Sequence, residues 1–523
     1  MPVKMRNATA LTRRRLLIAG AASAGMTMLG SHARPYLSRA ADRPGITHGL
    51  QSGDVTTDSG VVWARTDRPA RMLVEAATTD SFRDILTGTT VDVLPETDFT
   101  AKALLEELPA GTDIFYRIRF QDLASPTIFG EPMVGHFRTA PDVPHSLSFV
   151  WSGDTAGQGW GIDATRGGMR TYATMLENRP DFFIHSGDTI YADCTIPAKQ
   201  PMPDGETWHN LVTDEKSRVA ETLADYRGNY KYNLLDANVR AFNAQVPMFA
   251  QWDDHEVRDD WGPGELVRAS VRRDLLLLAA RGCRAFHEFM PMREAPAEPG
   301  RVYRRIPYGP LLDVFMLDMR SYRGPNGRVA PGPCGPAASL LGPKQIAWLK
   351  RALKASRATW KVIAADLPLG LASGDAVGFG DGPPYARELE IADLLAFIKR
   401  ARIRNTLWIT ADVHYTAAHY YDPDRAQFQD FDPFWEFVSG PIHAGTWWPS
   451  DLDNTFGPRV MFQKASSREL GENLPPSFGL QFFGHVAIDG ASEVMTVTLK
   501  DVGDNALWSV DLAPKPDAAP GSS

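Results

Sequence analysis

The sequence predicts an α+β protein in which a small β-sandwich precedes a larger core of alternating strands and helices. Residues 46–141 hold short segments of alternating apolar and polar residues separated by turn signals, which is the pattern of half-buried strands. From residue 146 onward, apolar runs alternate with helical patterns, as in layered α/β structures. The 523 residues, 43% of them hydrophobic and 23% charged, suffice for about two or three soluble domains.

The N-terminal strands are expected at 60–65, 71–77, 91–94, 101–105, 115–120 and 136–139. Their regular spacing predicts a β-sandwich over residues 45–141, with a linker at 139–144 (TAPDVP). The run LPAGT at 108–112, followed by Phe115-Tyr116, resembles the turn and aromatic strand of fibronectin III-like domains.

The core is expected over residues 145–514, followed by a disordered tail at 515–523. Its apolar strands are predicted at 148–151, 182–184, 248–252, 311–318, 360–365 and 407–410. Helical patterns cover 168–178, 214–244, 265–289, 344–356 and 386–401, and strand-like alternation returns at 478–512. The sequence contains no internal repeat.

The first 41 residues are predicted to be a twin-arginine signal peptide. Arg13-Arg14-Arg15 precede an apolar, small-residue run at 18–29, and Ser31-His32-Ala33 offers a cleavage site, with Arg39-Ala40-Ala41 as an alternative. An ordinary secretory signal and an uncleaved anchor are the alternatives. We therefore expect export by the twin-arginine machinery to the periplasm or the medium, and no stable membrane span in the mature protein.

Charge and cysteine content exclude several classes of protein. The net charge of −8 gives no basic footprint for nucleic acid. Cys194, Cys283 and Cys334 form no CxxC pair, so neither a zinc ribbon nor a disulfide framework is expected. Cys194 is interpreted as a buried structural residue.

Four apolar segments each end in acidic or imidazole side chains. A single Asp after a strand is more often a helix cap than a metal ligand. Strand ends of one α/β layer meet at one edge, however, and several carboxylates together there repel each other unless cations are bound. The sequence therefore predicts a metal site built from Gly153-Asp154, Gly187-Asp188 with Tyr191, Asp253-Asp254-His255-Glu256 and Asp412-Val413-His414.

The donor types favour Fe(III), Ca²⁺, Mn²⁺ or Mg²⁺ over a zinc site rich in histidine and cysteine, because carboxylates and a phenolate are hard oxygen ligands. The sequence has no HExxH zinc motif and no GxSxG serine elbow, and the GQGWG run at 157–161 lacks the spacing of a dinucleotide fingerprint.

The order GD, GDxxY, DHE and DxH resembles that of calcineurin-like metallophosphoesterases. The runs WDDHEV at 252–257, WEFVSGP at 435–441, LDMR at 317–320, LQSGD at 50–54 and VWAR at 62–65 resemble the PhoD-type alkaline phosphatases within that superfamily. The resemblance covers nearly everything after residue 45. It implies a layered α/β/β/α metallophosphoesterase core and an exported phosphoesterase that acts on small phosphate mono- or diesters.

The resemblance also implies roles for the first two motifs. Asp154 would bind the first metal, Asp188 would bridge two metals, and Tyr191 would bind Fe(III) as a phenolate. Some relatives supply a cysteine in the first motif, where this chain has Asp154.

In the later motifs, Asp254 stands where the wider superfamily has Asn, with Asp253 as the alternative ligand. Asp412 and His414 stand at the two histidine positions of GHxH. These replacements make the site richer in oxygen and more negative. They suit Fe(III) with Ca²⁺ better than a dizinc or Fe–Zn site, with Mn²⁺, Mg²⁺ or Zn²⁺ as other possible divalent ions.

The implied mechanism is attack of a metal-bound hydroxide on phosphorus. His255 would protonate the leaving group or, alternatively, orient a ligand, and Arg65 or Arg320 would clamp the phosphate. We expect a monomer.

Two alternatives remain. The same resemblance allows a phospholipase D-like phosphodiesterase. A calcium-stabilised cell-surface binding module is the non-enzymatic alternative, but Tyr191 and His414 are poor calcium ligands.

Overall fold

The structure, a computed structural model, describes residues 43–263, 269–326, 338–372 and 375–516. The predicted signal peptide and most of the predicted tail lie outside the described residues. None of the helices that are described is long and apolar enough to cross a membrane.

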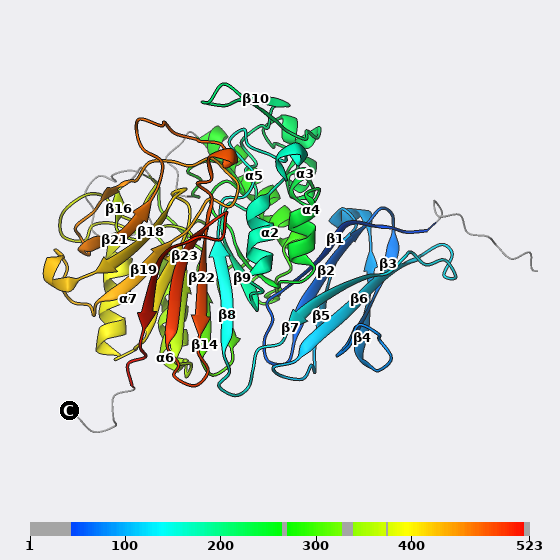
Figure 1. Cartoon of the computed structure of the whole chain (residues 1–523), viewed down its shortest axis with the longest axis horizontal. Helices are drawn as coiled ribbons and strands as arrows, with labels where there is room; N and C mark the ends of the chain where they lie inside the picture. The colour runs from blue at the N-terminus through cyan, green and yellow to red at the C-terminus, as the bar shows by residue number, and fades with distance from the viewer. Residues whose placement is uncertain (1–42, 264–268, 327–337, 373–374, 517–523) are drawn as a thin grey trace, which may run out of the picture. The chain divides into compact units, whose positions relative to one another are not determined.

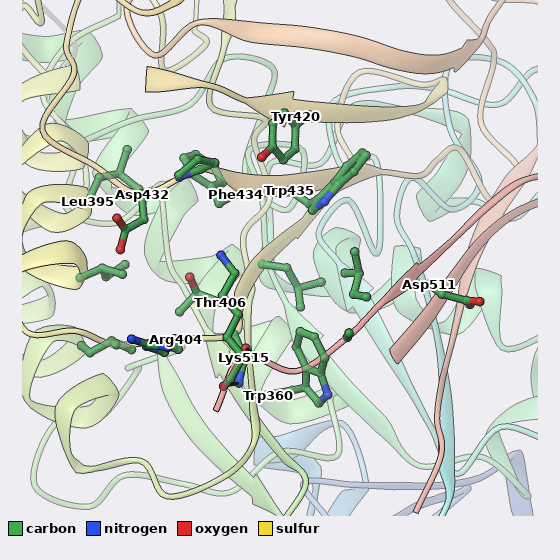
Figure 2. A pocket seen from close by; sticks show the side chains of 17 residues that line it. Trp360, Leu395, Arg404, Thr406, Tyr420, Asp432, Phe434, Trp435, Asp511 and Lys515 are labelled. Atoms are coloured by element: carbon green, nitrogen blue, oxygen red, sulfur yellow. Dashed lines mark hydrogen bonds between the residues drawn. The ribbon is translucent and has the colours of Figure 1, made fainter. Parts of the chain in front are cut away.

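Two large sheets form the centre of the unit from Pro44 onward (Figure 1). The second sheet runs in the order β13 (Arg304–Tyr308), β14 (Leu312–Met316), β15 (Trp360–Ala364), β17 (Thr406–Thr410), β19 (Phe434–Val438), β18 (Thr416–Tyr421) and β21 (Pro458–Lys464). Strands β14, β15, β17 and β19 are parallel. A cavity of about 520 Å³, bordered by Trp360, Tyr420 and Trp435, lies where β15 and β19 begin (Figure 2).

The first sheet runs in the order β24 (Ala506–Leu512), β23 (Met495–Asp501), β22 (Phe482–Ile488), β8 (Leu147–Ser152), β9 (Phe182–Ser186), β12 (Met248–Gln251), β1 (Ile46–Gly53), β2 (Gly60–Thr66) and β5 (Thr100–Leu105). Its central strands β8, β9 and β12 are parallel. Apolar side chains of the two sheets meet in one buried cluster, which includes Trp151 and Phe249 of the first sheet and Val362 and Phe437 of the second.

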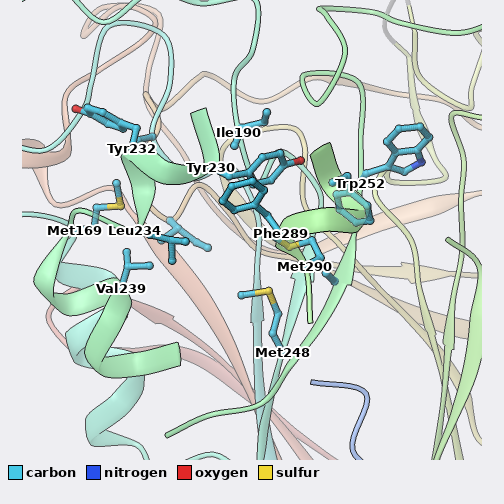
Figure 3. Close-up of a cluster of buried hydrophobic side chains, with 14 of the residues drawn as sticks. Met169, Ile190, Tyr230, Tyr232, Leu234, Val239, Met248, Trp252, Phe289 and Met290 are labelled. Atoms are coloured by element: carbon cyan, nitrogen blue, oxygen red, sulfur yellow. The ribbon is translucent and has the colours of Figure 1, made fainter. Parts of the chain in front are cut away.

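Helices cover the outer face of each sheet. Against the first sheet pack α2 (Arg170–Glu177), α3 (Leu223–Asn233), α4 (Ala237–Asn243) and α5 (Ala269–Phe289), and their shared core contains Tyr230, Phe289 and Met248 (Figure 3). Against the second sheet pack α6 (Gly342–Ala355) and α7 (Glu388–Arg400). The predicted α/β/β/α core is thus confirmed.

The N-terminal strands form the predicted sandwich, but one of its sheets continues the core sheet. The four-stranded sheet β4-β3-β6-β7 packs on β1, β2 and β5, and its strands are β3 (Ala70–Ala77), β4 (Ile85–Val93), β6 (Asp113–Asp122) and β7 (Met133–Arg138). Strand β1, which the sequence did not predict, pairs with β12 of the core in parallel, with Gly53 opposite Met248.

A buried ion pair reinforces this junction. Asp54, which follows β1 and is 1% exposed, accepts hydrogen bonds from Arg304 Nε at 2.8 Å and Nη2 at 2.7 Å. The backbone N–H of Arg293 donates to the same carboxylate at 2.8 Å. Arg304 also donates to the carbonyl of Ala250 in β12, so the pair joins β1, β12 and β13.

We expect Asp54→Asn to lower the free energy of unfolding by about 3 kcal/mol, because it leaves the Arg304 charge buried without its counter-ion. Asparagine tolerates the positive φ of 45° at this position, so the backbone is not strained by the change. Denaturant unfolding measures the effect. Asp92→Asn is the control, since the Asp92 pair with Arg71 is exposed and should contribute nothing measurable. Equal losses in the two variants would contradict the account.

Candidate metal centre

Five aspartates occupy the same position relative to five parallel strands. Each is the second residue after the last residue of its strand: Asp154 after β8, Asp188 after β9, Asp253 after β12, Asp366 after β15 and Asp412 after β17. Because parallel strands end at one edge of a sheet, this spacing directs all five carboxylates to one place. The two sheets meet there, so the site draws on both.

Four of these aspartates, Asp154, Asp188, Asp253 and Asp412, lie with Asp254, His255 and His414 in overlapping groups of ligand-type atoms. One group joins Asp154, Asp188 and His414, a second joins Asp188, Asp254 and His255, and a third joins Asp253, Asp254 and Asp412; the atoms within each lie within 4.8 Å of one another. Asp188 belongs to the first two groups and Asp254 to the last two. The arrangement could therefore hold more than one cation, with carboxylates shared between them.

The strand ends also show why a glycine stands beside the cluster. Gly440 is the second residue after β19, the position that carries Asp in the five strands above. A Cβ atom at Gly440 would lie 2.2 Å from Asp154 Oδ2, so only glycine leaves room for that carboxylate.

Several carboxylate oxygens in the cluster are buried without a hydrogen-bond donor. Among the described residues, none donates a hydrogen bond to either oxygen of Asp154 or Asp366, to Oδ2 of Asp253 or to Oδ1 of Asp254. A buried carboxylate without a donor is strongly unfavourable, and a bound cation removes that penalty. Asp318, which follows β14 at the same spacing, is different because Trp252, Ser321 and the backbone of Arg320 all donate to it. The cluster therefore fits hard, oxygen-preferring cations.

Burial and mutual repulsion change the pKa values of the cluster. Burial, reinforced by neighbouring carboxylates, raises the pKa of Asp154, Asp188 and Asp412 well above the ordinary range. Burial raises the pKa of Asp254 to about 6, against the opposing charge of Arg320. Without cations, Asp154, Asp188 and Asp412 would resist ionisation at neutral pH.

The phenol of Tyr191 and the imidazole of His414 lie together on one side of the site. His414 Nδ1 lies 2.5 Å from the carbonyl oxygen of Gly445, so this nitrogen carries the proton. His414 Nε2 is then an acceptor, 2.8 Å from Tyr191 Oη and 3.6 Å from Asp154 Oδ1. Burial lowers the pKa of His414 to about 4, so the ring is neutral and its free nitrogen can bind a metal.

His255 is held at the edge of the cluster by Asp193. Its Nδ1 lies 2.8 Å from Asp193 Oδ1, and its backbone N–H donates to Asp188 Oδ1 at 3.3 Å. Burial alone would lower the pKa of His255, but the carboxylates of Asp254 and Asp193 raise it to about 10. The ring is therefore protonated at neutral pH.

Arg320 is fully buried among carboxylates. It makes a short ion pair with Asp253, and its Nη2 lies 2.9 Å from Asp375 and 3.4 Å from Asp412. Asp254 and Asp366 are also within 4.0 Å of the guanidinium, at 3.7 and 3.6 Å. Its Nη1 has no hydrogen-bond partner within the described part of the chain. One arginine thus faces five carboxylates and still has a free donor.

The comparison with known families decides the identity of this fold and site. The model of the PhoD-like phosphatases matches residues 149–499, and the model of the N-terminal domain of PhoD-like phosphatases matches residues 31–141. The chain belongs to the PhoD-like phosphatase family. Membership of this family implies phosphoesterase activity.

Individual relatives agree with this assignment. Alkaline phosphatase D of Bacillus subtilis (strain 168) is 27% identical over 437 residues, which cover 76% of this chain and 69% of that protein. A solved structure of PhoD superposes with a TM-score of 0.67 at 20% identity, covering 90% of this chain and 89% of the other. Purple acid phosphatase PPD1 from yellow lupin (Lupinus luteus) seeds superposes with a TM-score of 0.56 at 12% identity, covering 90% and 74%. The two structures show the same fold.

One residue that was predicted to belong to the site of this PhoD-like phosphatase lies away from the carboxylate cluster. Arg65, expected to clamp phosphate, sits on β2 and bonds to Asp98 at 3.2 Å and to Thr47 Oγ1 at 3.1 Å. Thr47 lies in β1 and Asp98 in the connection between β4 and β5, and no ion pair or hydrogen bond of Arg65 with a described residue involves the cluster. The prediction for Arg65 is wrong, because the VWAR run forms a strand of the sandwich and not an edge of the site.

Two residues of the site, Asp366 and Asp193, were not predicted from the sequence. Asp366 follows a strand that was predicted, at the same spacing as the other four aspartates, and that spacing is the signal that would have found it. Asp193 lies two residues after Tyr191, but its contact with His255 has no local signal. Cys194 next to it has its pKa raised by burial to about 12, which agrees with a structural thiol.

We expect the protein stripped of cations by a chelator to lose stability as pH rises from about 4 to 8. An unfolded aspartate has a pKa of about 3.9, whereas Asp254 in the folded chain has one of about 6, and Asp154, Asp188 and Asp412 are also raised. The free energy of unfolding is therefore highest below the unfolded pKa of about 3.9. It falls as the pH passes through the raised pKa values that these aspartates have in the folded chain.

Thermal unfolding of the chelated protein across this pH range measures the effect. The Asp154→Asn/Asp412→Asn variant should give a flatter pH dependence, because two of the raised groups are gone. The same slope for both proteins would show that the cluster does not cause it.

Proposed function

We propose that this chain is an exported, metal-dependent phosphoesterase of the alkaline phosphatase type that hydrolyses phosphate monoesters and diesters at the carboxylate cluster. The observation that carries the proposal is the set of buried carboxylate oxygens without donors, gathered at parallel strand ends. Family membership supplies the reaction class.

Two overlapping ligand groups would hold the cations. Asp154, Asp188, Tyr191 and His414 combine carboxylates with a phenol and a neutral imidazole, a set that suits Fe(III). Asp188 would be shared with a second ion.

The second set offers oxygen ligands only, which suits Ca²⁺, with Mn²⁺, Mg²⁺ or Zn²⁺ as alternatives. It consists of Asp253 or Asp254, Asp366 and Asp412. Bound cations of this kind lower the pKa of a water ligand and neutralise charge on phosphate oxygens.

The chain's own residues would handle the proton and the substrate. His255, kept protonated by Asp193 and Asp254, can donate a proton to the leaving oxygen of the ester. Arg320 can direct its free Nη1 donor to a phosphate oxygen, while its other nitrogens remain bound to carboxylates. These roles use the protonated ring of His255 and the Nη1 donor of Arg320, which has no hydrogen-bond partner among the described residues.

Export rests on the sequence alone. Arg13-Arg14-Arg15 and the apolar run after them support passage through the twin-arginine machinery to the periplasm or the medium. This route carries folded proteins, which suits an enzyme that binds its metals before export.

Hydrolysis of a chromogenic phosphate monoester and of its diester, measured side by side, tests the proposal. Chelation, or Asp188→Asn, should reduce both rates by at least about 100-fold, because both remove the electrostatic stabilisation of the reacting phosphate. Asp92→Asn, far from the cluster in sequence and exposed, should keep full activity.

The ratio of monoester to diester rates then separates a phosphatase from a phospholipase D-like diesterase. Full activity in the Asp188→Asn variant would rule out catalysis at this cluster.

A further inference from the structure

A strongly basic groove lies at the end of the second sheet that is opposite the carboxylate cluster. The groove has a volume of about 670 Å³ and is lined by Thr359 and Lys361 at the start of β15 and by Asn405 just before β17. Asp366 and Asp412 of the cluster follow the other ends of the same two strands. A strand of this length spans roughly 17 Å, so the groove and the catalytic edge face opposite directions.

The lining of the groove has a charge opposite to that of the whole protein. It contains six basic residues and the single acid Glu493, whereas the chain carries a net charge of −8. The carboxylate of Glu493 already accepts a hydrogen bond from Thr359 Oγ1 at 2.8 Å. The basic residues are Lys354, Arg357, Lys361, Arg402, Arg404 and Lys515.

Three of these cations are exposed and have no counter-ion. Lys354, Arg357 and Arg402 make no side-chain hydrogen bond or ion pair with any residue in the described ranges. On the same helices, Lys350 pairs with Asp393 and Arg400 with Asp430, whereas Lys344 and Arg351 are exposed and make no ion pair with a described residue, but these two do not line the groove. Leaving three positive charges unpaired in one hollow favours an anion there.

The ends of the neighbouring helices explain only part of this charge. Lys354 lies in the last turn of α6, where a cation interacts favourably with the helix dipole. Arg357 and Arg402 directly follow Ser356 and Ala401, the C-cap residues of α6 and α7, so the helix dipoles also favour these two cations. Lys361, Arg404 and Lys515 lie beyond the helix ends and line the same groove. The helix ends therefore do not account for the whole basic lining.

The wall of the groove is built by hydrogen bonds to the backbone near the end of the described chain. Asn405 accepts from the Lys515 backbone N–H at 2.8 Å and donates to the Lys515 carbonyl at 3.1 Å. Arg404 Nη1 donates to the carbonyl of Pro516 at 2.8 Å. Ile403, Arg404, Asn405 and Lys515 also line the aromatic cavity of Figure 2, where Arg404 and Lys515 lie opposite Tyr420 and Trp435. The basic groove thus adjoins a space for an organic group.

We propose that this groove binds the phosphate groups of an anionic ligand, independently of the catalytic cluster. Guanidinium groups match phosphate oxygens in shape and charge, and arginine binds phosphate without a metal ion. A lipid headgroup and a soluble polyphosphate present the same chemistry. Binding at the groove would leave the catalytic edge of the sheets directed away from the bound anion.

Two probes, used with the full chain in the presence of a chelator, test the proposal and separate the two sources. Tripolyphosphate is titrated by calorimetry, and phosphatidylcholine vesicles containing phosphatidic acid are tested by co-sedimentation. The chelator removes cations from the catalytic cluster, so phosphate binding that persists cannot depend on them. We expect binding that weakens with salt, and the probe that binds identifies the source.

The decisive variant is Arg357→Glu/Arg402→Glu, which should weaken binding by about tenfold or more. Each substitution replaces a guanidinium that can donate hydrogen bonds to phosphate by a carboxylate that repels it. Arg357→Gln/Arg402→Gln should weaken binding less. This variant replaces the decisive one if charge reversal disturbs folding. The matched control is Arg83→Glu/Lys344→Glu, which changes two exposed cations away from the groove by the same charge. Hydrolysis of the chromogenic monoester should be unchanged in all three variants.

Failure of both probes to bind would overturn the proposal. An equal loss of binding in the control variant would also overturn it, because the charge of the whole protein would then be the cause. Neither result bears on the phosphoesterase activity, which is measured separately.

Discussion

Repulsion among buried carboxylates is the constraint on which the rest of the carboxylate cluster depends. Asp154, Asp188, Asp253, Asp366 and Asp412 converge because five parallel strands from two sheets end at one edge. Arg320 supplies one positive charge against them, and several of their oxygens have no hydrogen-bond donor among the described residues. Bound cations allow these carboxylates to ionise together in a buried site, where they would otherwise stay protonated.

Much of this site could be predicted from the sequence, because its signals are local. A buried apolar run followed by a glycine or alanine and an acid is visible without a structure, and it located Asp154, Asp188 and Asp412. Asp366 carries the same signal and was missed. The prediction for Arg65 was wrong, since a short motif match says nothing about which way a strand faces.

The parts that could not be predicted depend on contacts between distant segments. Strand β1 joins the core through its pairing with β12, about 200 residues away, and parallel pairing leaves no local pattern. The Asp54–Arg304 and Asp193–His255 pairs are likewise formed only by the fold. The two ends of the second sheet then differ in sign, because acids follow its strands at one end and basic residues surround their starts at the other.

Elemental analysis of the full chain, purified without chelator, tests the central claim most directly. The account predicts more than one tightly bound cation per chain, and loss of these ions in an Asp154→Asn/Asp188→Asn variant that remains folded. A folded, hydrolytically active protein with no stoichiometric metal would contradict it, because the buried carboxylates would then be balanced in some other way.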